Sequence, residues 1–151
     1  MGMDIYGNKP TSPKGEYFRA NVWYWRPLWN YCCENCSISQ KLAEGGHYND
    51  GMGMNSAQAA HLAEELQNLL DSKHVANHRL NEERRLRALP DEVCVICGGK
   101  GIRSDAIVQG ECNGCSGKGR RRPFSTWYSF HEEVVAEFIE FLRDSGGFSI
   151  N

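Results

Sequence analysis

Four cysteines in two closely spaced pairs carry the clearest chemistry in this 151-residue chain. Cys94 and Cys97 form one C-x-x-C pair, and Cys112 and Cys115 form a second pair after fourteen intervening residues. Thiolate sulfur is a soft ligand, and two such pairs supply the four ligands of a closed tetrahedral zinc site. A closed shell leaves no position for a reactive water, so the spacing predicts one structural Zn²⁺ ion.

Glycines follow both cysteine pairs at the same two offsets, at Gly99 and Gly101 and again at Gly117 and Gly119. The chain must turn tightly for both sulfurs of a pair to face one ion, and glycine tolerates the positive φ that such turns use. Amides that follow the cysteines can also donate hydrogen bonds to the sulfurs. The pattern C-x-x-C-x-G-x-G therefore occurs twice and predicts two matching turns around one ion.

The repeated pattern resembles the cysteine-rich zinc domain of DnaJ-type chaperones, whose unit is C-x-x-C-x-G-x-G. That domain carries four repeats and binds two zinc ions, whereas this chain has two repeats within residues 94–119 and no His-Pro-Asp motif of a J-domain. The resemblance implies a zinc-bound, hairpin-like substructure and no chaperone activity by itself. Two redox-active pairs are the alternative, but the sequence lacks the βαβ context of a thioredoxin-like motif.

The composition is that of an ordinary globular protein, with 40% hydrophobic residues, 24% charged residues and a net charge of −2. The chain as a whole is not basic enough to predict nucleic-acid binding from charge alone. Seven cysteines, four of them in metal spacing, indicate a reducing compartment rather than a disulfide scaffold. There is no long apolar run and no signal-peptide pattern, so we expect a cytoplasmic protein without a membrane partner.

The hydrophobic pattern predicts a small single α+β domain with about three main helices and a short sheet. Extended segments are expected at residues 4–6, 17–25 and 147–150, and helices at residues 27–36, 55–71 and 73–88. Pro27 is expected in the first turn of its helix. A last helix is expected to be capped by Ser125 or Thr126. Residues 1–90 and 123–151 would form this domain, with residues 91–122 inserted as the zinc module.

An aromatic stretch and a glycine-rich loop together suggest a small phosphate-bearing or nucleotide-like ligand. These rings are expected first of all to build the core, and the alternative is that Trp23 or Trp25 with Arg26 forms a stacking surface. The loop at residues 45–53 could present backbone N–H groups to an anion, or it could be a plain surface turn. Its candidate ligand-binding side chains are His47, Asn49 and Asp50.

A third group of cysteines, Cys32, Cys33 and Cys36, could begin a second metal site with His47. That ligand set is incomplete and irregular. Buried free thiols that pack as small hydrophobic groups are the alternative.

Catalytic motifs are missing from the sequence, so an enzyme is the weakest reading. Residues 131–133 look like the H-x-E of a zinc deaminase, but the P-C-x-x-C that must follow it is missing. His74 and His78 form an i, i+4 pair that could chelate a metal or lie solvated on a helix surface.

Basic residues follow the last cysteine and could contact nucleic-acid phosphates; they are Lys118, Arg120, Arg121 and Arg122. Opposing this, the last helix is acidic, with a net charge of −4 over residues 131–144.

Outside the cysteine motifs, the chain resembles a group of bacterial and phage proteins with no established activity. The likeness lies in residues 4–7, 16–29 and 49–51 and in the ending at 141–148. It implies that the N- and C-terminal segments form one domain with the zinc module inserted. The sequence thus favours a non-catalytic, zinc-stabilised protein that binds a small phosphate-bearing ligand, for instance in a phage. A nucleic-acid-binding regulator and a protein-interaction module are the alternatives.

Overall fold

The computed structural model describes residues 2–151 and divides the chain into two compact units. Unit 1 consists of Met1–Glu83 together with Tyr128–Asn151, and unit 2 is Arg84–Trp127. Unit 2 is thus longer at both ends than the insertion expected at 91–122. Helices and small antiparallel sheets make up the structure, which confirms the α+β class.

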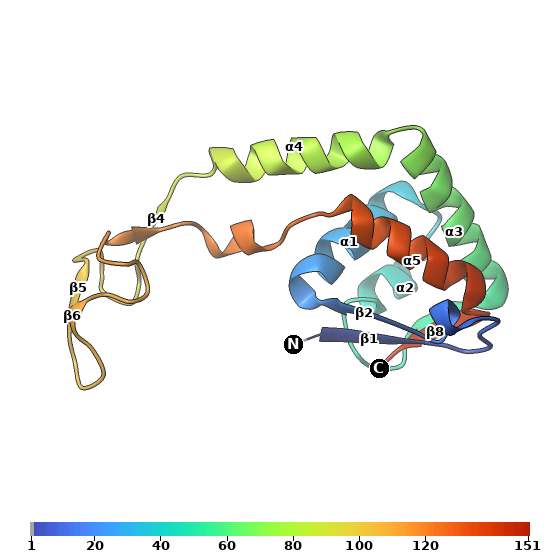
Figure 1. Ribbon diagram of the computed structural model, residues 1–151, viewed down its shortest axis with the longest axis horizontal. Coiled ribbons are helices and arrows are strands. Elements are labelled where there is room, and N and C mark those ends of the chain that lie inside the picture. The colour runs from blue at the N-terminus through green and yellow to red at the C-terminus, as the bar shows by residue number, and fades with distance from the viewer. Residues whose placement is uncertain (1) are drawn as a thin grey trace. The chain divides into compact units, whose positions relative to one another are not determined.

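A four-stranded antiparallel sheet forms the base of unit 1, in the order β2-β1-β8-β3 (Figure 1). The strands are β1 (Gly2–Gly7), β2 (Tyr17–Asn21), β3 (Gly53–Asn55) and β8 (Gly147–Ile150). The strands expected at both ends of the sequence are confirmed. They pair with one another at the centre of the sheet, where Ile5 lies opposite Ile150.

One face of this sheet is buried and the other faces solvent. Met3 and Ile5 on β1 alternate with exposed or half-buried residues, and Phe18 and Ala20 do so on β2. Such alternation is typical of a sheet covered on one side. The cover includes α3 (Ser56–Asp71) and α5 (Glu132–Asp144), which pack against each other, and α3 also packs on β8 (Figure 1).

The helix α1 (Val22–Asn35) begins five residues before the position expected for it. Residues 17–25 are therefore not extended throughout, since β2 ends at Asn21 and the helix starts at once. The Asn21 side chain accepts hydrogen bonds from the N–H groups of Trp23 and Tyr24, which caps the helix. Pro27 lies inside the helix rather than in its first turn. Burial of Trp25 and Trp29, whose rings stack at 5.3 Å, favours the helix despite the proline.

Within residues 2–151, four helices have thirteen residues or more, where about three main helices were expected. The third helix, α3, has the predicted capping box between Asn55 and Gln58. The short α2 (Gln40–Gly45) was not predicted, and α4 (His74–Ala88) contains the boundary between the two units. The last helix starts at Glu132 with no side-chain cap, so the expected cap at Ser125 or Thr126 is wrong.

Short strands and two 3-10 turns complete the structure. In unit 2, β4 (Glu92–Val93) pairs with β7 (Arg120–Arg121), and β5 (Ile102–Ser104) pairs with β6 (Gln109–Glu111). The turns are η1 (Pro13–Gly15) and η2 (Phe124–Trp127). None of the helices within residues 2–151 is both long and apolar enough to cross a bilayer.

The cap of α1 is open to a direct test. Asn21→Ala removes both cap hydrogen bonds and should lower the free energy of unfolding of unit 1 by about 1 kcal/mol. Asn30→Ala is the matched control, because Asn30 is exposed inside the same helix, where alanine has the higher helix propensity. Urea unfolding followed by tryptophan fluorescence measures both. An Asn21→Ala protein as stable as the control would contradict the assigned helix start.

Candidate metal centre

The four predicted cysteine ligands of unit 2 converge on one point. Their sulfur atoms all lie within 4.8 Å of one another. The Cys94–Cys112 sulfurs are 3.9 Å apart and the Cys97–Cys115 sulfurs are 3.8 Å apart. Four sulfurs at about 2.3 Å from a tetrahedral ion would be separated by about 3.8 Å. The cluster therefore has the dimensions of a site for one metal ion.

Burial sets this cluster apart from the rest of unit 2. The four cysteines are at most 8% exposed, and they alone form the hydrophobic core cluster of this unit. The second core cluster of the chain lies in unit 1. Unit 2 thus has no aliphatic or aromatic core within the described residues, and its sulfur cluster occupies the place of one.

The two cysteine motifs are related by an internal repeat of eighteen residues. The Gly101 N–H lies 3.3 Å from the Cys97 sulfur, and the Gly119 N–H lies 3.2 Å from the Cys115 sulfur. The strand pairs follow the same repeat. Eighteen residues separate β4 from its equivalent β6 and β5 from its equivalent β7, so the β4–β7 pair corresponds to the β6–β5 pair. Each half thus supplies two sulfurs and one N–H···S hydrogen bond, as the repeated glycines predicted.

The halves also hold each other through their backbones. The N–H of Cys94 donates to the Gly119 carbonyl, and the N–H of Cys112 donates to the Gly101 carbonyl, each at 2.9 Å. Gly101 has a φ of +74°, and a Cβ added there would lie 2.3 Å from the Gly117 oxygen. Only glycine suits both the backbone angle and this close approach.

The electrostatics of the cluster favour ionisation of one thiol first. Burial opposes ionisation of Cys97, but the Gly101 N–H and the neighbouring thiols outweigh it and lower the pKa of Cys97 to about 7. In Cys115, burial prevails over the Gly119 N–H and raises the pKa to about 11. A metal ion must therefore displace protons to bind all four sulfurs as thiolates.

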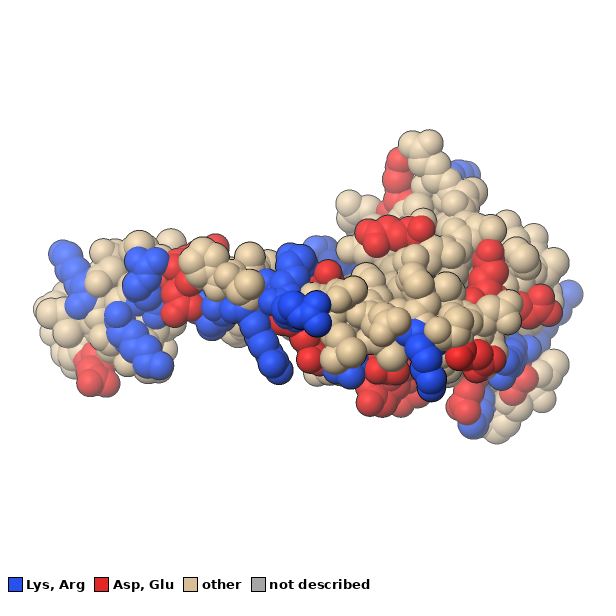
Figure 2. Space-filling model, turned by 90° about the horizontal axis from the view of Figure 1, so that it is seen from above, with Lys and Arg blue, Asp and Glu red and all other residues tan. Residues whose placement is uncertain are grey.

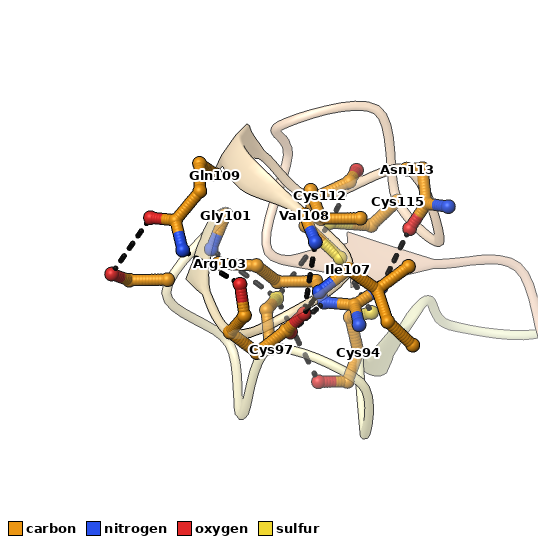
Figure 3. Close-up of polar contacts among 12 residues, drawn as sticks. Cys94, Cys97, Gly101, Arg103, Ile107, Val108, Gln109, Cys112, Asn113 and Cys115 are labelled. Carbon is orange, nitrogen blue, oxygen red and sulfur yellow. Dashed lines mark hydrogen bonds and ion pairs between the residues drawn. The ribbon is translucent and has the colours of Figure 1, made fainter.

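A hairpin beyond the cluster is held by one arginine. Arg103 donates from Nε to Asp105 Oδ2 at 2.6 Å and from Nη1 to Asn113 Oδ1 at 2.9 Å (Figure 3). Asp105 also accepts from the N–H groups of Ile107 and Val108, which closes the turn. The Val108 N–H, followed by Arg103, lowers the pKa of Asp105 to about 2, so its carboxylate stays charged.

The predicted ligand-binding aromatics are only partly at the surface. Trp25 is fully buried, and its indole N–H donates to the Gly46 carbonyl at 2.7 Å, so Trp25 belongs to the core. Trp23 is half-buried and packs 4.8 Å from the ring of Tyr128, over which the Arg26 guanidinium also lies, at 5.9 Å. Tyr128 was not predicted as a site residue, because nothing in the local sequence pattern marks it.

The glycine-rich loop already uses several of its amides within the protein. The Gly51 N–H donates to Ile150, and the Met52 N–H donates to the Asp50 carboxylate at 3.1 Å. Asn49 donates from its side chain to the Gly2 carbonyl at 3.2 Å. These amides are therefore directed at protein acceptors rather than at an anion.

His47 lines a shallow hollow with two carboxylates. Its neighbours there include Cys33, Glu34 and Glu44. Burial, followed by the charge of Arg26, lowers the pKa of His47. A phosphate in this hollow would meet a neutral imidazole and two negative side chains.

The remaining cysteines do not gather into a second ligand cluster within the described part of the chain. Among residues 2–151, the four cysteines of unit 2 are the only group with three or more ligand atoms close enough to hold an ion. Cys32 is fully buried, and burial raises the pKa of Cys33 and Cys36 to about 11 and 12, as expected of packed, protonated thiols.

The histidine pair of α4 contacts aromatic rings, with His74 exposed and His78 half-buried. The His74 Nδ1 is 2.7 Å from the Tyr31 hydroxyl. The His78 ring lies 4.7 Å from Tyr31 and 4.6 Å from Phe130. His74 is thus at the surface, as expected of a solvated pair, whereas His78 is partly covered by Tyr31 and Phe130.

The basic residues after the last cysteine divide into two kinds. Arg120 donates to the Asp91 carbonyl, and Arg122 donates to the carbonyls of Leu86 and Leu89 and to the Asp91 side chain. Lys118 is exposed, and Arg121 is half-buried. Arg120 and Arg122, two of the four residues predicted to contact phosphates, thus also hold the segment at residues 86–91 in place.

Paired glycine variants test the geometry of the cluster. Gly98→Ala places a side chain at a φ of +59° with nothing within 4 Å, and should cost about 1 kcal/mol. Gly101→Ala adds the clash with the Gly117 oxygen and should cost about 3 kcal/mol or more. Competition with a chromophoric chelator measures the zinc affinity of both. Equal affinities would contradict the close packing of the two halves.

The thiol pKa values predict how metal binding depends on pH. Apparent zinc affinity should fall as the pH falls, because each proton retained by a sulfur must be displaced. Each sulfur that still carries a proton before zinc binds adds about one to the slope of log affinity against pH. Zinc titrations at several pH values measure this slope. A pH-independent affinity would mean that thiolates are not the ligands.

Comparisons of the chain with protein-family models, curated proteins and solved structures found no match. The likeness to the zinc domain of DnaJ-type chaperones therefore stays a prediction, which depends on the two repeated motifs. The chemistry assigned to the site depends on the four sulfurs and the hydrogen bonds around them.

Proposed function

We propose that Cys94, Cys97, Cys112 and Cys115 hold one structural Zn²⁺ ion. The sulfur spacing, the burial of all four thiols and the two N–H···S hydrogen bonds support this. With four thiolates the coordination shell is closed, so the ion would fix the fold of unit 2 and supply no catalytic water. The free thiols of the whole chain fit a reducing compartment such as the cytoplasm.

We further propose that the chain is a non-catalytic protein that binds nucleic acid through unit 2. The observation that carries this is a segregation of charge that the net value hides. Unit 2 contains nine Lys and Arg residues and four Asp and Glu residues, a net charge of +5, whereas unit 1 has eight and fifteen, a net charge of −7. Four thiolates around Zn²⁺ would add −2 and leave unit 2 at +3. A basic unit joined in one chain to an acidic one is a mark of polyanion binding.

The repeat presents one pair of equivalent lysines on this unit. Lys100 and Lys118 occupy equivalent positions, each between two glycines of its motif, and both are exposed. Figure 2 shows Lys and Arg side chains at several places on unit 2, with fewer Asp and Glu. Arg120 and Arg122 keep further donors beyond those that reach backbone carbonyls. Together these side chains offer several phosphate contacts within 44 residues.

The small-ligand hypothesis receives less support. Trp25 is buried, the loop amides donate within the protein, and the hollow at His47 contains Glu34 and Glu44. These features oppose an anionic ligand in unit 1.

A protein partner is the second candidate, and one observation favours it. Unit 2 exposes seven large apolar side chains: Val93, Val95, Ile96, Ile102, Ile107, Phe124 and Trp127. Exposed apolar residues in such number can mark an interaction surface. The charge of the same unit favours nucleic acid as the first partner to test.

Salt-dependent binding tests the proposed function. The protein should bind a fluorescein-labelled 20-nucleotide strand at low salt, and binding should weaken steeply as salt rises. Lys100→Gln with Lys118→Gln should lower the affinity by roughly fivefold and the salt slope by about 1.4. Fluorescence anisotropy measures both quantities, and chelator-treated protein should bind poorly because unit 2 loses its core.

The matched control removes the same charge from unit 1. Lys9→Gln with Lys41→Gln changes two exposed lysines there and should leave affinity and slope unchanged. No salt-sensitive binding of any strand or duplex by the zinc-loaded protein would contradict the proposed function.

A further inference from the structure

The internal repeat makes two arginines equivalent in position but not in their contacts. Arg103 and Arg121 are eighteen residues apart, and each pairs with an equivalent residue across its two-stranded sheet, Gly110 and Glu92 respectively. The Arg103 Nε donates to Asp105, and its Nη1 donates to Asn113. The repeat therefore allows the missing contacts of Arg121 to be read by comparison.

Arg121 lacks both of those partners. Eighteen residues on from Asp105 stands Pro123, and the counterpart of Asn113 is Val95. Neither side chain can accept a hydrogen bond. The Nε of Arg121 is buried and has no hydrogen-bond partner among residues 2–151, whereas the same atom of Arg103 is paired. A buried donor left unpaired is unfavourable, and an incoming acceptor would relieve that cost.

This arginine lines a hollow that lies wholly within unit 2. The hollow has a volume of about 150 Å³, and its lining residues are Gly114, Arg121, Arg122, Phe124 and Trp127. The Phe124 and Trp127 rings stack on each other at 5.7 Å, with 28° between their planes, and are 52% and 60% exposed. Cavities of about this volume accept one benzene-sized ring. The site therefore combines aromatic surface, two cations and room for one planar group.

We propose that this hollow binds one unstacked base of a single-stranded nucleic acid. The base would lie against the Phe124–Trp127 pair, and an acceptor on the base edge or the adjoining phosphate would take a hydrogen bond from the Arg121 guanidinium. This deepens the proposed function and rests on it. Two arginines and no acidic residue line the hollow, which suits a polyanion. Aromatic side chains on a basic surface are the means by which single strands are bound without sequence preference.

Single strands and duplexes distinguish this site from a general attraction to phosphate, because bases in a duplex are already stacked. The probes are fluorescein-labelled dT15, the corresponding U15 strand and a 15-base-pair duplex, all with zinc-loaded full-length protein. Arg121→Gln and Trp127→Ala should each weaken binding of a single strand by about tenfold and change duplex binding by less than about twofold. Trp127→Phe should restore most of the loss, since a ring remains for stacking.

Lys118→Gln is the matched control, because it removes one positive charge outside the hollow. It should weaken strand and duplex binding alike, by about twofold. The zinc content of each variant shows whether unit 2 is still folded. If Arg121→Gln loses zinc, the Trp127→Ala variant, which changes an exposed side chain, tests the base site instead.

The outcomes separate the two proposals. Equal losses on strand and duplex, or none on the strand, would overturn the base site while leaving nucleic-acid binding intact. Failure of the wild-type protein to bind any probe at low salt would overturn both. A preference between dT15 and U15 would identify the source of the strand.

Discussion

The convergence of four cysteine sulfurs is the constraint on which unit 2 depends. Its 44 residues bury no cluster of aliphatic or aromatic side chains, and the sulfurs form its only hydrophobic core cluster. Segments of this size seldom fold on a hydrophobic core alone and commonly use a metal or disulfides. Metal binding of this type contributes about 10–16 kcal/mol of apparent folding energy in small zinc modules. The glycines, the strand pairs and the exchanged backbone hydrogen bonds all serve to keep the sulfurs in place.

A core that consists of four sulfurs has consequences for the surface of unit 2. Because the sulfurs form the core, the other side chains of unit 2 lie mostly at its surface. Many of them are basic, and others are apolar and exposed. The repeat then supplies the same framework twice, and small differences between its halves give each half a different role. Asp105 accepts from the Arg103 Nε, whereas its counterpart Pro123 leaves the Arg121 Nε without a partner among the described residues. Unit 1 has its own aromatic core and a net negative charge. The residues predicted there to bind a ligand are not arranged as a basic, aromatic hollow like the one at Arg121.

How far the sequence predicts this structure differs between local and long-range features. The cysteine spacing, the glycine offsets and the capping box at Asn55 follow from short patterns, and the structure has all three. The start of α1 was predicted too late, because the proline at position 27 was taken to mark the first turn of the helix. Burial of Trp25 in the core stabilises a helix that begins earlier, after the Asn21 cap. The packing of the α4 histidines on Tyr31 depends on residues more than forty positions away, which no local pattern contains. The unpaired Nε of Arg121 could have been suspected from the repeat, by noting which residues replace the partners of Arg103.

The central claim is that four thiolates bind one structural zinc ion, and counting zinc by native mass spectrometry tests it most directly. Protein purified without chelators should carry one Zn²⁺ per chain. Cys97→Ser should carry none and lose the fold of unit 2, whereas Cys33→Ser, which alters a thiol outside the cluster, should still carry one. A Cys97→Ser protein that keeps its zinc, or a wild-type protein that takes up none or two, would contradict the account.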